Sequence, residues 1–291
     1  MAKKKQRKHK KKNRFISFFL TLGIILCIGV IGVAGYKLIT TWMEYREGDE
    51  EYEGLREYTA VVEPEPEEVM PETTGESEVE EEPEEEITAP EKEYDLDMHT
   101  NRKPPIDVDW KSLKEINEDI VGWLYIGALD ISYPVTQGED DDYYLHRTFR
   151  RENNFAGSIF VEAENSSDFS DSNTIVYGHN MLNGSMFGSL SKLTKESEML
   201  YKKGPYFWIL TPNGNYRYKM FSIHVTSVTS DVYTLFTGAD EEFISWCKKM
   251  EEVSDVDIGK HKYNLNSKVV TLSTCTGDSR SRYVVQGIAV K

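Results

Sequence analysis

An uncharged apolar segment near the N-terminus constrains this chain more than any other feature. It runs from Phe15 to Tyr36 and follows nine Lys or Arg residues that lie between Lys3 and Arg14. As a helix with a rise of about 1.5 Å per residue, the segment would be roughly 33 Å long, enough to cross a hydrocarbon core about 30 Å thick. The sequence therefore predicts a basic tail over residues 1–14 and a transmembrane helix over residues 15–39.

The charges that flank this helix predict its orientation. Because basic flanks stay on the cytoplasmic side of a membrane, the tail should be cytoplasmic and everything after Met43 should lie outside. This makes the chain a single-pass type II protein of the cell membrane with an extracellular C-terminal domain. A cleaved signal peptide, cut at Val33-Ala34-Gly35, is the alternative, but apolar regions of signal peptides usually span only about 7–15 residues. The short basic block abuts the apolar segment, so it indicates membrane topology and no nucleic-acid partner.

The composition of residues 40–100 predicts a helical stalk followed by an acidic spacer. The helical stalk could continue to about residue 62, and the segment from Glu63 to Asp97 then carries seventeen acidic residues and a single Lys92. A segment so rich in Glu and Pro cannot bury enough apolar surface to offset the entropy of ordering, so we expect an extended, disordered tether.

Residues 101–291 are the part of the chain that can form a globular domain. A helical pattern of Trp110, Leu113, Ile116 and Ile120 comes first, and a second helix is expected at about 239–252. Between and after them, short strand-like segments alternate with turns, and Thr211–Asn215 is a strong hairpin turn. The expected strands are 122–126, 131–135, 157–161, 174–177, 206–210, 216–227, 268–273 and 283–290. The fold class is therefore mainly β with a few helices, a barrel or a sandwich.

The strand-like segment before Cys275 indicates chemistry. Thr271-Leu272-Ser273-Thr274-Cys275 ends in a lone thiol, and Arg282 follows seven residues later. If the two strands are neighbours, the guanidinium group lies near the thiol and can hydrogen-bond a substrate carbonyl or an oxyanion. Arg280 is the rival for this role, but it lies on the more loop-like part.

A base for this thiol is expected at His179. Among the six histidines it is the one that follows a predicted strand at a glycine and begins a loop, in Tyr177-Gly178-His179-Asn180. A thiol, an imidazole and a permanent cation from separate parts of the chain suggest covalent acyl transfer.

The other cysteines have ordinary interpretations. Cys27 lies in the predicted membrane span, and Cys247 suits a small buried residue of a helix. A Cys247–Cys275 disulfide is formally possible, although the chain has no disulfide framework. No His, Cys, Asp or Glu cluster has the spacing of metal ligands, so we expect neither a metal nor another cofactor.

These motifs together resemble the sortases, the membrane-anchored cysteine transpeptidases of Gram-positive bacteria. Residues 271–275 match the family's TLxTC signature, Arg282 stands where its arginine follows, and Tyr177-Gly178-His179 matches its histidine motif. Further landmarks over residues 105–291 resemble class B; they are Val108-Asp109-Trp110, Tyr133-Pro134-Val135, Gly188-Ser189-Leu190 and the helix at about 239–252. The interval between Cys275 and Arg282 is short for that class.

The resemblance implies an eight-stranded β-barrel with an N-terminal helix and a helix before the cysteine strand. It also implies cleavage of a C-terminal sorting signal after Thr through a thioacyl intermediate on Cys275, and transfer of the secreted protein to an amine of a cell-wall peptidoglycan precursor. His179 would be the general acid and base, and Arg282 would stabilise the oxyanion. Ser273, Thr274 and Leu145 are the expected substrate-binding residues. A cysteine endopeptidase that uses water, or a catalytically silent surface-binding module, are the alternatives.

Overall fold

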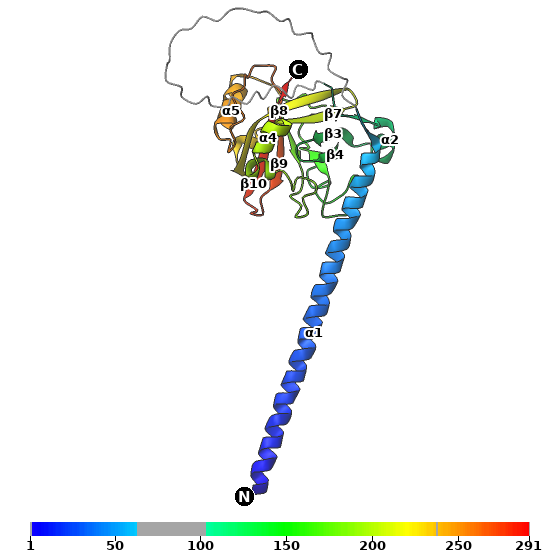
Figure 1. Ribbon diagram of the computed structural model, residues 1–291, viewed down its shortest axis with the longest axis vertical. Coiled ribbons are helices and arrows are strands. Elements are labelled where there is room, and N and C mark those ends of the chain that lie inside the picture. Colours follow the sequence, from blue (N-terminus) through cyan, green and yellow to red (C-terminus); the bar gives the residue numbers. More distant parts are fainter. Residues whose placement is uncertain (1, 63–102, 237, 291) are drawn as a thin grey trace, which may run out of the picture. The chain divides into compact units, whose positions relative to one another are not determined.

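A computed structural model shows the chain as two compact units, residues 1–51 and 52–291 (Figure 1). The structure describes residues 2–62, 103–236 and 238–290. The acidic segment predicted to be a disordered spacer lies almost entirely outside the described residues.

The first unit is formed by α1, a single helix over Ala2–Leu55 that continues into the second unit. Its large apolar side chains between Leu20 and Trp42 are exposed, and within the described part of the chain it is the one helix long and apolar enough to cross a membrane. Lipid is the solvent that suits such a surface, because water would contact apolar side chains along the whole segment. The helix extends beyond the predicted span of residues 15–39 on both sides.

The second unit begins earlier in the chain than the boundary expected at residue 101. Tyr52 and Leu55 are buried in it, and the 3-10 helix η1 (Arg56–Tyr58) leads into strand β1 (Thr59–Val61). Strand β1 pairs antiparallel with β2 (Ile106–Val108), so the end of the expected stalk belongs to the compact unit. The pairing partners lie more than forty residues apart, and no local pattern in the sequence could have indicated the pairing.

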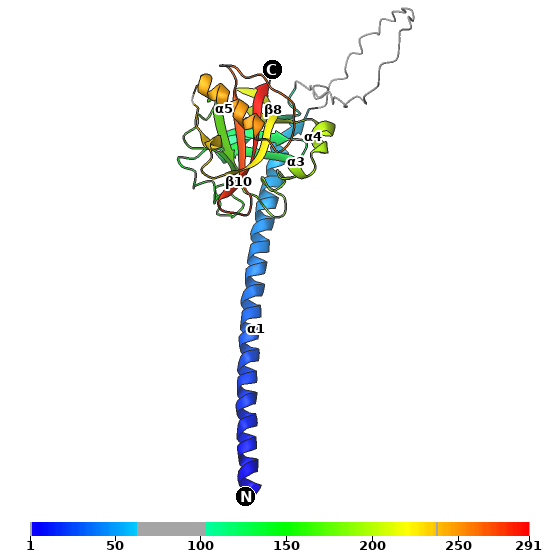
Figure 2. The same ribbon diagram turned by 90° about the vertical axis from the view of Figure 1, so that its left-hand side faces the viewer.

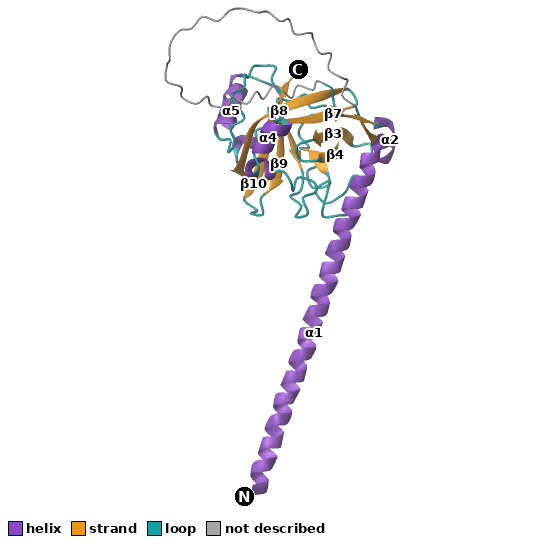
Figure 3. Cartoon of the chain, viewed as in Figure 1, coloured by secondary structure: helices purple, strands orange, loops and turns teal. Residues whose placement is uncertain are grey.

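Eight strands close into the predicted barrel, drawn in orange in Figure 3. Their order around the barrel is β10-β8-β7-β3-β4-β5-β6-β9, and all neighbours are antiparallel except the pairs β4–β5 and β6–β9. The strands are β3 (Ile120–Ile126), β4 (Ile131–Thr136), β5 (Ile159–Val161), β6 (Asn173–Tyr177), β7 (Tyr206–Thr211), β8 (Gly214–Ser227), β9 (Val269–Cys275) and β10 (Ser281–Val290). Closure of the sheet removes the unpaired edges that an open sheet would leave.

Four α-helices and one 3-10 helix accompany the barrel in the described part of the second unit, beyond η1 and the end of α1. Here α2 (Trp110–Ile116) follows an Asp109 N-cap, and Ile120, expected in the same helix, is the first residue of β3. The short helices α3 (Lys192–Lys195) and α4 (Glu198–Lys203) were not predicted. The expected helix before the cysteine strand is α5 (Glu241–Glu252), and η3 (Asp231–Tyr233) precedes it.

Helix α5 covers the outer face of the barrel beside β8 (Figures 1 and 2). Asp240 caps it by accepting a hydrogen bond from the backbone N–H of Phe243 at 2.8 Å. Its buried face, Phe243, Trp246, Cys247 and Met250, packs in one cluster with apolar residues of β8, β9 and β10. A cluster of this kind holds β9 and β10 in place, because apolar burial contributes about 25 cal/mol per Å².

A buried polar chain fixes the register of β6, β9 and β10. The Thr271 hydroxyl on β9 donates to Asn173 Oδ1 on β6 at 2.8 Å and accepts from Gln286 Nε2 on β10 at 3.1 Å. All three side chains are fully buried. A slip of any one strand would leave buried polar groups without partners, at a cost of about 1–3 kcal/mol each.

Candidate active site

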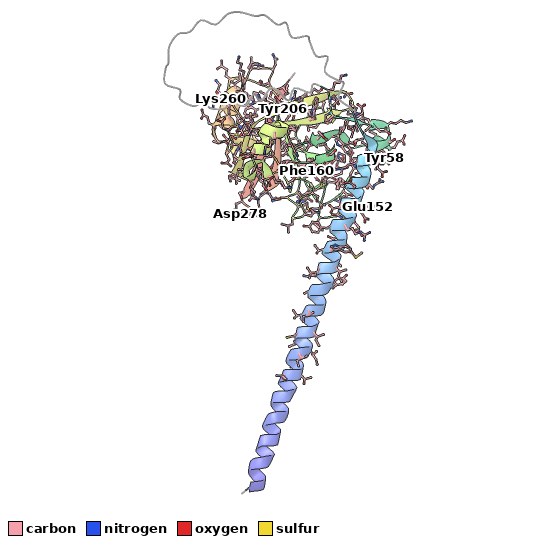
Figure 4. All side chains as sticks on the ribbon, viewed as in Figure 1. Tyr58, Glu152, Phe160, Tyr206, Lys260 and Asp278 are labelled. Carbon is pink, nitrogen blue, oxygen red and sulfur yellow. The ribbon has the colours of Figure 1, made fainter. Side chains whose placement is uncertain are left out.

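Cys275 is the last residue of β9, and Arg282 is its direct cross-strand neighbour on β10. The short interval between them makes a tight hairpin whose tip carries Asp278, labelled in Figure 4. The Arg282 Nη1 donates to the carbonyls of Ser279 at 3.1 Å and Ser281 at 2.9 Å, which holds the side chain at this hairpin. Its Nη2 has no hydrogen-bond partner among the residues that the structure describes, so it remains available to a substrate oxygen.

The alternative cation, Arg280, is engaged elsewhere. Its Nη2 lies 3.2 Å from Asp278 Oδ2 at the hairpin tip, and its side chain is 86% exposed. The cross-strand register therefore favours Arg282 over Arg280 as the cation beside the thiol.

His179 follows β6, which is parallel to β9. Tyr177 pairs with Ser273 in this ladder, and the next backbone N–H, of Gly178, donates to the Ser273 carbonyl at 3.2 Å. Continuing the same register by two residues brings His179 level with Cys275. The neighbouring Asn180 shows that the loop after β6 contacts the end of β9, because its side-chain amide donates to the Cys275 carbonyl at 2.7 Å. Cys275, His179 and Arg282 thus lie at one end of three adjacent strands.

One ring nitrogen of His179 is held by the loop before β5. The distance from Nε2 to the Leu145 carbonyl oxygen is 2.7 Å. A carbonyl only accepts hydrogen bonds, so Nε2 carries the proton of the neutral ring. Nδ1, which has no partner among the described residues, is then the nitrogen left for proton transfer.

The surroundings of His179 favour its neutral form. Burial lowers the pKa of His179, and the charge of nearby His146 lowers it further, whereas the hydrogen bond to the Leu145 carbonyl opposes both. The ring is therefore suited to accept a proton when one is delivered by the thiol.

Two of the three expected substrate-binding residues are buried in β9, directly before Cys275. Ser273 is 1% exposed and its hydroxyl lies 2.8 Å from the hydroxyl of Tyr233. Thr274 is 4% exposed, and its hydroxyl has no hydrogen-bond partner among the described residues. Leu145 is partly exposed next to His179. Exposure thus favours contact with a peptide for Leu145 and not for the two hydroxyls.

Sequence reasoning missed Tyr233, which joins the site from η3. Burial raises the pKa of Tyr233, while its hydrogen bond to Ser273 and the positive charge of Arg282 lower it. Nothing near Tyr233 in the sequence indicates that its side chain lies at the site. Asn180 was also missed, although its position next to His179 was a signal.

A half-buried carboxyl group supports the strand that leads to His179. Glu162 accepts a hydrogen bond from the Tyr177 hydroxyl at 2.6 Å, and the Tyr177 ring stacks on Tyr233 with centroids 6.5 Å apart. Burial raises the pKa of Glu162 to about 7, and Asp141 contributes through a hydrogen bond and through its negative charge. The hydrogen bond from the Tyr177 hydroxyl opposes this shift.

The other cysteines are free thiols away from this site. Cys247 is fully buried, as predicted, and burial raises the pKa of its thiol to about 12, so it is unreactive at neutral pH. Across the described ranges no group of three or more His, Cys, Asp or Glu residues could hold a metal ion.

Comparisons with known proteins identify the family. Residues 124–290 match the Sortase domain. The chain is similar to sortase B of Listeria monocytogenes, with 37% identity over 194 residues that cover 65% of this chain and 76% of that protein. Sortase B of Staphylococcus aureus is 28% identical over 281 residues, covering 94% of this chain and 97% of the relative. The solved structure of Clostridium perfringens sortase B matches with a TM-score of 0.56 and 31% identity, over 62% of this chain and 99% of that one.

The barrel and these matches define an enzyme of the cysteine transpeptidase type. The chain belongs to the sortase family, and its relatives place it in class B. The predicted eight-stranded barrel and the resemblance to class B sortases are confirmed.

Proposed function

We propose that this sortase cleaves a C-terminal sorting signal after Thr and joins the secreted protein to an amine of a cell-wall peptidoglycan precursor. The observation that carries the proposal is the adjacency of β6, β9 and β10, which supports Cys275 as nucleophile, His179 as acid and base, and Arg282 as the oxyanion's partner. Membership of the sortase family favours an enzyme over a silent binding module.

The first half of the reaction forms a thioester. The Cys275 proton passes to Nδ1 of His179, and the thiolate adds to the carbonyl carbon of the substrate threonine. The resulting oxyanion accepts hydrogen bonds from the Arg282 guanidinium, which is charged at any relevant pH. The oxyanion then collapses, the C–N bond breaks, and the leaving amine takes the proton from His179.

The second half returns the enzyme to its starting state. The acceptor amine adds to the thioester carbonyl and gives its proton to Nδ1 of His179. The C–S bond breaks, a new amide forms, and the thiolate recovers its proton from the imidazolium. The two steps together need no reactant other than the sorting-signal substrate and the acceptor amine.

The sorting peptide is proposed to bind across the solvent-exposed part of Leu145. Leu145 is partly exposed and its backbone carbonyl contacts the His179 ring, so its side chain is proposed to pack against the sorting peptide. Ser273 and Thr274, both buried, would act indirectly, Ser273 by orienting Tyr233.

The cellular setting follows from α1. We propose that this helix anchors the chain in the cell membrane with the basic tail inside and the barrel outside, where secreted proteins and cell-wall precursors meet.

The test uses the full-length chain in detergent micelles, because Tyr52–Val61 contributes to the compact unit. Peptides that carry a threonine-containing sorting signal are supplied with and without an amine nucleophile, and products are identified by mass spectrometry. An amine-linked product formed at the Thr carbonyl supports the proposal. Hydrolysis alone in both mixtures would favour the cysteine endopeptidase.

Cys275→Ala should abolish cleavage, since it removes the nucleophile. Cys27→Ala is the matched control, because this thiol is exposed on α1 outside the barrel unit. Equal activity of both variants would rule out the proposed nucleophile.

A further inference from the structure

The loop whose Leu145 carbonyl holds His179 is tied to the end of α1. The Tyr52 hydroxyl donates a hydrogen bond to the Gly157 carbonyl at 2.6 Å and accepts one from the Phe149 backbone N–H at 3.3 Å. Tyr52 is 5% exposed, and Gly157 and Phe149 are also buried. Hydrogen bonds within a buried site hold their partners more firmly than exposed ones, because water cannot replace them.

Gly157 transmits this contact directly to Leu145. Its φ is +56°, and a Cβ added at this position would lie 2.5 Å from the Leu145 carbonyl oxygen. The backbone of Gly157 is therefore packed against the same peptide that accepts the proton of His179. A displacement of Gly157 would displace the Leu145 carbonyl.

Tyr52 also supports the second loop that defines the position of His179. Its ring meets the Tyr133 ring edge to face, with centroids 5.4 Å apart. The Tyr133 hydroxyl accepts a hydrogen bond from the Met186 N–H at 3.1 Å. Met186 lies in the loop that begins at His179, and this loop is closed by the Phe187 N–H donating to the His179 carbonyl at 2.9 Å.

We propose that Tyr52 is a positioning residue for His179. It anchors the loop that presents the Leu145 carbonyl to Nε2 and, through Tyr133, the loop that carries His179 itself. The part of the chain that leads from α1 into the barrel thereby sets the orientation of the acid–base residue. The inference rests on the proposed catalytic role of His179.

Tyr52→Phe in the full-length chain is the test, because it removes the hydroxyl and keeps the ring that packs on Tyr133. Tyr201→Phe is the matched control, since its hydroxyl also donates to a backbone carbonyl, that of Asp257 at 3.0 Å, away from the site. Activity is measured as the rate of amine-linked product, corrected for the folded fraction. The second readout is the Nε2–H NMR signal of His179 in chain labelled with ¹⁵N-histidine, assigned by its absence in His179→Gln.

Tyr52→Phe is expected to lower kcat by about tenfold and to leave KM within about twofold, because a small misplacement of a catalytic group affects chemistry more than binding. The His179 Nε2–H signal, slow to exchange in the unaltered chain, should be lost to exchange with water. Tyr201→Phe should change neither readout.

An unchanged kcat, or a lower kcat with an unchanged Nε2–H signal, would overturn the role of Tyr52. The NMR signal does not depend on turnover. An unaltered chain without transpeptidase activity would therefore refute the proposed function, whereas the NMR comparison would still report on the anchoring.

Discussion

Glu162 should make the stability of the barrel depend on pH in a way that Glu162→Gln removes. Its carboxyl group is half-buried against Tyr177, and burial and Asp141 raise its pKa from 4.5 to about 7. The folded state therefore holds a proton on Glu162 at a pH where the unfolded chain has released it. By linkage, the group stabilises the fold fully below pH 4.5, and this contribution is lost as pH rises from 4.5 through about 7.

The size of the effect follows from the same values. At about 1.36 kcal/mol per pKa unit, the full difference would be roughly 3 kcal/mol. Since the group is only half-buried, solvent screening reduces this to about 1 kcal/mol. For a unit of this size, 1 kcal/mol changes the Tm by about 2–4 °C.

Thermal unfolding of the full-length chain in micelles at pH 4 and pH 8.5 measures the effect. Glutamine can still accept from the Tyr177 hydroxyl, so the comparison isolates the charge. The Tm of Glu162→Gln minus that of the unaltered chain should be about 2–4 °C more positive at pH 8.5 than at pH 4. Glu115→Gln, at an exposed position of α2, should give the same difference at both pH values. A Glu162→Gln difference that does not change with pH would refute the reasoning.

Two further substitutions test the geometry around the thiol. Arg282→Lys should lower kcat by about 100-fold, the usual loss of one oxyanion donor, whereas Arg280→Lys should stay within about twofold; equal losses would contradict the assignment. Gly178→Ala should lower the free energy of unfolding by about 1–3 kcal/mol in a denaturant titration, because the added Cβ would lie 2.8 Å from the fully buried Phe187 ring. An unchanged stability of Gly178→Ala would show that the ring can yield.

Much of the barrel was predictable because its strands have local signals. The hairpin turn of residues 211–215 is an example: β7 ends at Thr211 and β8 begins at Gly214, with Pro212-Asn213 between them. The helix expected at 239–252 was likewise found at Glu241–Glu252, because Asp240 is a good N-cap and the apolar residues that follow repeat at helical spacing.

What could not be predicted depends on contacts between residues far apart in the sequence. Tyr233 reaches Ser273 from a 3-10 helix forty residues upstream, and Tyr52 reaches Gly157 over a separation of 105 residues. Both are ordinary tyrosines in their local context. Their roles exist only after the barrel has closed and brought its loops together.

The site itself is a consequence of strand register, which explains how a short motif can define it. His179 lies level with Cys275 because Tyr177 is paired with Ser273, and Arg282 lies beside Cys275 because the two are cross-strand partners. A slip of one residue would turn the side chains proposed as catalytic to opposite faces of the sheet. Thr271, the first residue of the motif that ends at Cys275, opposes such a slip, because its buried hydroxyl bonds both neighbouring strands. The motif thus supplies the proposed nucleophile at one end and, four residues earlier, the contact that holds β6 and β10 in register with β9.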